Sequence, residues 1–102
     1  MMQPIREKIY EDKDVEVLCD YLFEGKKISL HLNFNPGAWT PSKFKRYQKI
    51  FQKMLSDFRD KRYTEVYALP FENDVKAQKL IAMFGFKEFD RRQGFVLMKR
   101  EV

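Results

Sequence analysis

The stretch NDVKAQKLIAMFGF, residues 73–86, decides how the rest of the chain is interpreted. Asn73 or Asp74 can cap the start of a helix, because a short side-chain oxygen accepts a hydrogen bond from a free N–H of the first turn. The apolar residues that follow recur at three- and four-residue spacing and define one buried face: Ala77, Leu80, Ile81 and Phe84. Gly85 can take the left-handed conformation that ends a helix. The stretch therefore predicts a short helix that packs on a sheet.

The segments on either side of residues 73–86 predict β-strands. Residues 64–71 are rich in β-branched and aromatic side chains, and Pro70, which has no N–H for a strand ladder, favours the end of that strand. Residues 87–90 and 94–100 flank a polar turn and predict a final hairpin. A strand, a helix and a hairpin therefore make up the C-terminal half of the chain.

A long amphipathic helix is predicted before the strand at 64–71. Thr40 and Pro41 are residue types preferred at the N-cap and at the first helical position, and the pattern continues to about Lys61. Six residues at helical spacing form its apolar stripe: Phe44, Tyr47, Phe51, Met54, Leu55 and Phe58. Its opposite face carries four lysines: Lys43, Lys45, Lys49 and Lys53. Such a helix is expected to lie with its stripe against a sheet.

Three strands are predicted upstream of this helix, at residues 5–10, 15–23 and 28–34, and a turn at 24–27 joins the last two as a hairpin. In the third strand two sets of side chains alternate: Ile28, Leu30, Leu32 and Phe34 with Ser29, His31 and Asn33. Strand–helix–strand units pair in parallel, whereas hairpins are antiparallel. The order of elements thus predicts a single α/β (α+β) domain over residues 1–102, with a mixed sheet of five to six strands and two main helices.

The composition restricts the classes of protein that the chain can belong to. Its 102 residues are 44% hydrophobic and 34% charged, which is typical of one globular domain. No apolar run reaches the length of about 18 residues that a membrane span needs, and no stretch resembles a signal peptide. We therefore expect a cytoplasmic protein with no membrane partner.

Cys19 and His31 are the only residues of their types. A single cysteine allows no internal disulfide, and its place in a strand predicts a buried, unreactive thiol. Because His31 lies in the middle of a strand, we expect a polar strand residue rather than a catalytic one. No cluster of metal-ligand residues is visible, so no metal is expected.

Five residues of the 73–86 stretch match, in register, the motif of the GNAT family of N-acetyltransferases: Asn73, Ala77, Leu80, Gly85 and Phe86. From about residue 27 to residue 100 the order of elements also resembles this family. The resemblance implies that acetyl-CoA or CoA binds where two parallel strands splay apart, with its pyrophosphate at the N-terminus of the long helix. It also implies an abbreviated N-terminal part, so that the acceptor site is built by another chain or is absent.

The resemblance implies cofactor-binding residues at the start of the long helix and at the asparagine of the motif: Trp39, Thr40, Ser42, Lys43, Phe44 and Asn73. The segment 37–42 departs from the family's glycine pattern, and Pro41 removes one N–H donor. Ile81 replaces the tyrosine that serves as the general acid, while Glu16 and Glu24 are candidates for a general base by location only. These departures predict an acetyltransferase-like protein with eroded catalytic motifs.

Two other functions fit the same sequence. The compact form resembles GNAT-like chains of bacteriophages, which implies a non-catalytic virion protein or a binder of a host protein, with self-association or a protein partner. The net charge is +5, and residues 42–63 carry eight lysines and arginines against two aspartates. This basic helix could bind nucleic acid through its phosphates, although solvated lysines on an amphipathic helix explain the same pattern.

Overall fold

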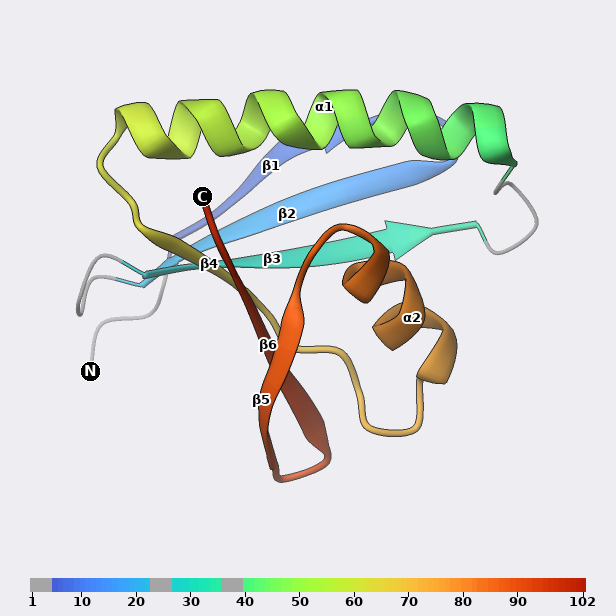
Figure 1. Cartoon of the computed structure of the whole chain (residues 1–102), viewed down its shortest axis with the longest axis vertical. Helices are drawn as coiled ribbons and strands as arrows, with labels where there is room; N and C mark the ends of the chain where they lie inside the picture. The colour runs from blue at the N-terminus through green and yellow to red at the C-terminus, as the bar shows by residue number, and fades with distance from the viewer. Residues whose placement is uncertain (1–4, 23–26, 36–39) are drawn as a thin grey trace.

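The computed structural model describes residues 5–22, 27–35 and 40–102. Within these ranges six strands and two helices follow one another: β1 (Ile5–Glu11), β2 (Val15–Leu22), β3 (Lys27–Phe34), α1 (Pro41–Asp60), β4 (Glu65–Ala68), α2 (Val75–Met83), β5 (Lys87–Arg92) and β6 (Phe95–Glu101). The strands form one sheet in the order β1-β2-β3-β4-β6-β5 (Figure 1). The predicted α+β fold, a mixed sheet of five to six strands with two main helices, is confirmed.

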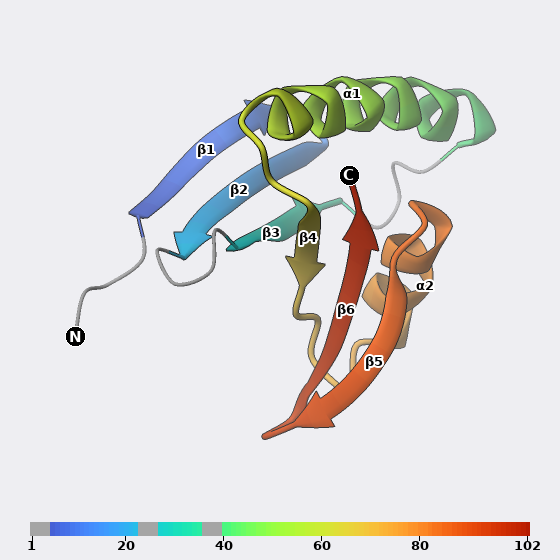
Figure 2. The ribbon, with the colours of Figure 1, turned by 60° about the vertical axis from the view of Figure 1, so that its left-hand side comes forward.

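The only parallel pair among the described strands is β3 with β4, and this pair is short. It joins residues 28–30 to residues 66–68, while β3 continues to Phe34. Beyond Ala68 the chain turns away toward α2, and the two strands diverge in both views of the ribbon (Figures 1 and 2). The sheet is therefore splayed at its centre, at the carboxyl ends of its parallel strands.

Helix α1 forms where its cap and its apolar stripe predict it. Thr40 is the N-cap, and its side chain accepts a hydrogen bond from the Lys43 N–H at 3.2 Å. The buried residues of the helix are Tyr47, Phe51, Leu55 and Phe58. No described helix is both long and apolar enough to cross a membrane.

Helix α2 is capped by Asp74, not Asn73, since Asp74 Oδ1 accepts from the Ala77 N–H at 3.1 Å. Strand β4 is shorter than the predicted strand at 64–71, because Pro70 interrupts the ladder after Ala68. Phe71 keeps only an isolated bridge to Phe95. The proline thus marks a strand end, as the sequence predicts.

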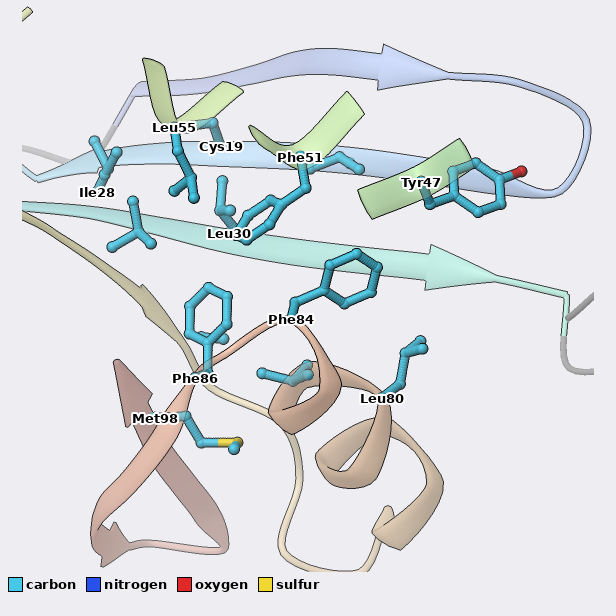
Figure 3. Packing of buried hydrophobic residues seen from close by; sticks show 14 of the residues in the cluster. Cys19, Ile28, Leu30, Tyr47, Phe51, Leu55, Leu80, Phe84, Phe86 and Met98 are labelled. Carbon is cyan, nitrogen blue, oxygen red and sulfur yellow. The ribbon is translucent and has the colours of Figure 1, made fainter. Parts of the chain in front are cut away.

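Both helices pack on the same face of the sheet, over a single hydrophobic core. Figure 3 shows Phe84 and Phe86 near Phe51, and the ring centroids of Phe51 lie 5.3 and 5.8 Å from theirs. Cys19 is fully buried in this core, and burial raises the pKa of its thiol to about 11, as expected for an unreactive cysteine. Among the described residues, no helix covers the opposite face, which we call the outer face.

The two edge strands of the sheet are irregular. The register between β1 and β2 shifts at Ile9, and the register between β5 and β6 shifts at Phe89. Each shift leaves one residue of the edge strand without a partner, which bends the strand and increases its twist.

Gly85 ends α2 with a φ of +91°, and Arg100 packs directly against it. The Arg100 guanidinium donates to the Phe84 carbonyl and lies 5.5 Å from the centre of the Phe51 ring. One side chain from β6 therefore satisfies a carbonyl at the end of α2 and covers the aromatic core.

Gly85→Ala is expected to lower the free energy of unfolding by about 2–3 kcal/mol, because the new Cβ adds backbone strain to a clash. That Cβ would lie 2.9 Å from Arg100 Nη1. Gly94→Ala is the matched control, since Gly94 has a φ of +83° but no atom within 4 Å of such a Cβ. Urea unfolding of both variants measures the difference, and equal losses would show that the Arg100 contact contributes nothing.

Candidate active site

A cavity of about 470 Å³ opens on the outer face where β3 and β4 diverge. One of its walls is polar and comes from the first three strands: Arg6, Asp20, Ser29, His31 and Asn33. The other wall is apolar except for the Asp74 carboxylate and comes from the segment after β4, from α2 and from β6: Leu69, Pro70, Phe71, Asp74, Ala77, Ile81 and Phe95. We call it the outer cavity.

A second cavity, the inner cavity, lies under the helices and holds about 50 Å³. Four residues line both cavities: Leu30, Leu32, Phe34 and Ile81. Three of these residues belong to β3, the strand that diverges from β4. The two cavities therefore come closest at the gap between β3 and β4. Ile81, only 6% exposed, stands at the same point.

His31 lies on the polar wall, directly after Leu30, the last residue of β3 that pairs with β4. Its side chain is exposed, and the imidazole has no hydrogen-bond partner within the ranges that the structure describes. It belongs to the polar set of β3, as the alternation predicts. The expectation of a polar strand residue holds, but the strand position places His31 in the outer cavity.

Beside His31, Asp20 forms a two-point ion pair with Arg6, whose Nε and Nη2 donate at 2.6 and 2.8 Å. The hydrogen bonds from Arg6 outweigh partial burial and lower the pKa of Asp20. Ser29, the neighbour of His31 on the same face, is 8% exposed. The polar wall therefore combines a fixed carboxylate, a fixed guanidinium and an imidazole that makes no hydrogen bond to another described residue.

The first turn of α1 places the residues predicted to bind the cofactor as follows. The N–H of Lys43 bonds to Thr40 Oγ1, and the N–H of Phe44 bonds to the Thr40 carbonyl at 2.9 Å. The Lys43 ammonium lies 3.0 Å from an Asp14 carboxylate oxygen. Ser42 is exposed, and its N–H is the one first-turn donor without an acceptor among the described residues.

The remaining predicted residues are dispersed. The Phe44 ring packs 5.3 Å from Phe84, at the C-terminal end of α2, whereas Asn73 is exposed at the other end, about 14 Å away at 1.5 Å per residue. Trp39 lies outside the described residues, as does Glu24. Glu16 accepts from Asn33 at 3.0 Å and does not line the outer cavity.

Sequence reasoning missed the polar wall. The signal was present in the alternation of β3, which puts Ser29, His31 and Asn33 on one face. What the sequence lacks is the register that brings Asp20 opposite Ser29 and the divergence that leaves His31 at an opening. The described residues hold no group of three or more potential metal ligands.

No protein-family model matches the chain, and no curated protein does. Solved structures do match. The GNAT domain of S. lividans PAT superposes with a TM-score of 0.70 at 10% identity, covering 87% of this chain and 54% of the other. The ribosomal-protein-S18-alanine N-acetyltransferase of Escherichia coli gives 0.61 at 10% identity, covering 99% and 70%. The N-acetyltransferase PseH of Campylobacter jejuni, in complex with acetyl coenzyme A, gives 0.57 at 16%, covering 88% and 70%.

The chain spans about half the length of the first of these structures. Likeness at such low identity concerns the fold alone. The sheet order, the single parallel pair and the two helices agree with it. The chain therefore has the GNAT fold.

Proposed function

We propose that this protein binds an acyl-CoA where β3 and β4 diverge and transfers the acyl group to an amine held in the outer cavity. One observation carries the proposal: the outer and inner cavities lie on either side of the splay and share four lining residues. Such a gap can place a small acyl group, which is what the inner cavity of about 50 Å³ has room for, next to a nucleophile in the outer cavity. The acetyl-CoA complex of PseH, which has the same fold, supports this choice of donor.

The residues of this chain fit CoA in part. The four apolar residues shared by the two cavities suit the acyl end of the thioester. The N-terminus of α1 carries positive partial charge, which suits the phosphates. The Thr40 side chain already accepts from the Lys43 N–H, and the Phe44 N–H makes the ordinary first helical bond to the Thr40 carbonyl. The phosphates would therefore rely on the Ser42 N–H and on the exposed Lys45. We therefore expect CoA to bind, but more weakly than at a helix start whose donors are all free.

His31 is the proposed general base, because imidazole is the side chain most often used for this role near neutral pH. A bound ammonium first gives one proton to water and becomes the free amine, whose nitrogen then bonds to the thioester carbonyl carbon. His31 accepts the second proton, which the nitrogen loses as that bond forms. The carbon–sulfur bond then breaks, and His31 returns the proton to the departing sulfur. The products are an amide and a free thiol.

Ile81 bears on the rate of this reaction. At the position where the family resemblance implies a tyrosine, a buried isoleucine offers no proton to the leaving sulfur. Because His31 must then serve both proton transfers, turnover is expected to be slow rather than absent. The eroded catalysis predicted from the sequence would therefore be measured as a low kcat.

Thermal denaturation with acetyl-CoA, CoA and the fragment pantetheine tests the proposal. A ligand at a hundred times its Kd stabilises a fold by about 2.7 kcal/mol, which raises the Tm of a domain of this size by several degrees. We expect a saturable rise with both CoA compounds and a smaller one with pantetheine. A flat titration up to millimolar CoA would refute the proposal.

The other functions stay predictions. No contact among the described residues favours a role in a phage particle, a protein partner or nucleic-acid binding by residues 42–63. In that segment Lys43 and Arg46 pair with Asp14 and Asp12, at 3.0 and 3.3 Å, so part of the positive charge is neutralised within the fold.

A further inference from the structure

We infer that the acceptor is a primary amine with an aromatic or other apolar group a few bonds from its nitrogen. The inference rests on the proposed function and names the substrate class for the same site. It follows from the division of the outer cavity into one polar and one apolar wall, which face each other across a single space.

Phe71 dominates the apolar wall. Its ring is 57% exposed and stacks on the Phe95 ring with centroids 5.0 Å apart and planes 26° from parallel. Leu69, beside it, is 45% exposed. Large apolar side chains that line a cavity and remain in water gain free energy when an apolar ligand group covers them.

The wall is held in place and has few polar groups left to offer. The Phe71 carbonyl accepts from the Asp74 N–H at 3.0 Å and from Gln78 Nε2 at 2.9 Å. The Glu72 carbonyl also accepts from Gln78, and the Pro70 carbonyl accepts from the Val96 N–H. A carboxylate on the substrate would therefore lose its water here without gaining a partner and would lie near the Asp74 carboxylate, which is costly.

The opposite wall suits the amine end. His31 faces the cavity without a hydrogen-bond partner in the described ranges, and Asp20 stays ionised beside it. Arg6 balances the charge of Asp20, while Asp74 adds a further negative charge to the lining. A cationic amine is therefore attracted to the cavity, and its nitrogen lies on the polar side when its apolar group covers Phe71.

The experiment uses the full chain and measures thiol release from acetyl-CoA with 2-phenylethylamine, ethanolamine and putrescine. We expect 2-phenylethylamine to give at least a tenfold higher kcat/KM than either polar amine. Phe71→Ala should raise the KM for 2-phenylethylamine about tenfold without changing the KM for acetyl-CoA, whereas Phe71→Leu should restore most of the loss. Phe89→Ala is the matched control, because Phe89 is 47% exposed and does not line the cavity.

Binding of the three amines, measured by calorimetry without acetyl-CoA, separates the two hypotheses. Binding of 2-phenylethylamine that weakens in Phe71→Ala but not in Phe89→Ala supports the inference about the ligand. If this binding occurs and no thiol is released, acyl transfer is refuted while the inference stands. Thiol release with ethanolamine or putrescine at an equal or higher kcat/KM would keep acyl transfer and overturn the inference. Failure of 2-phenylethylamine to bind or to react would overturn it as well.

Discussion

His31→Gln is expected to lower the kcat of acyl transfer by about 10²–10³-fold, which is the usual contribution of a general base. Glutamine keeps a polar side chain of similar length but takes up no proton. Because His31 is exposed and has no hydrogen-bond partner in the described ranges, its replacement leaves the fold intact. The loss should therefore fall on kcat and leave the Tm unchanged.

Steady-state kinetics at saturating acetyl-CoA measure this effect, with Lys53→Gln as the control. Lys53 is also exposed, and it lines neither the outer nor the inner cavity. We expect the control to keep the activity of the original protein. A kcat within threefold of that value in His31→Gln would show that the proton goes elsewhere.

Asp12→Ala is expected to cost about 2–3 kcal/mol of stability, or roughly 10–20 °C in Tm, since buried donors would lose their acceptor. Two tyrosine hydroxyls donate to this carboxylate, Tyr10 at 2.7 Å and Tyr47 at 2.9 Å. The N–H groups of Asp14 and Val15 donate to its other oxygen at 2.8 and 2.9 Å. Asp12 thus ties the β1–β2 turn to α1.

The same carboxylate makes stability depend on pH. Burial opposes ionisation of Asp12, but the hydrogen bonds from Tyr10, Asp14, Tyr47 and Val15 outweigh it and lower the pKa. A lowered pKa in the fold means that this stabilisation is complete above the unfolded value, near 4, and is lost as the pH falls.

Urea unfolding between about pH 6 and pH 2.5 checks both effects. Asp12→Ala should be less stable at neutral pH and should lose less stability on acidification. Asp57→Ala is the control, since the Asp57 side chain is exposed and no partner for it is found among the described residues. Parallel pH curves for Asp12→Ala and the original protein would contradict the assignment.

The local part of the fold could be predicted from the sequence, because its causes are local. The spacing of the α1 stripe, the cap at Thr40 and the stop at Gly85 each depend on a few neighbouring residues. The network around Asp12 could not be predicted, since Tyr47 is 35 positions away and only the packing of α1 on the sheet brings it near. Nothing in the sequence near Asp12 indicates which donors it will meet.

The candidate site was harder to predict for a similar reason. The sequence predicts the cap at Thr40, but it does not show that the Lys43 ammonium is held by the Asp14 carboxylate, 29 positions away. It also shows that His31 alternates with apolar residues, but not that the pairing of β3 with β4 stops one residue earlier. Both facts depend on how segments that are far apart in the sequence come together in the fold.

The irregular edge strands bear on how this protein behaves at high concentration. An open strand edge is a template for pairing with another molecule, and natural sheets often block it with bulges and charges. Here both edges combine a register shift with charged residues: Arg6, Glu7 and Lys8 on β1, and Glu88, Asp90, Arg91 and Arg92 on β5. Growth of the sheet into fibrils by strand addition is therefore disfavoured at both ends, so a purified sample should resist amyloid formation.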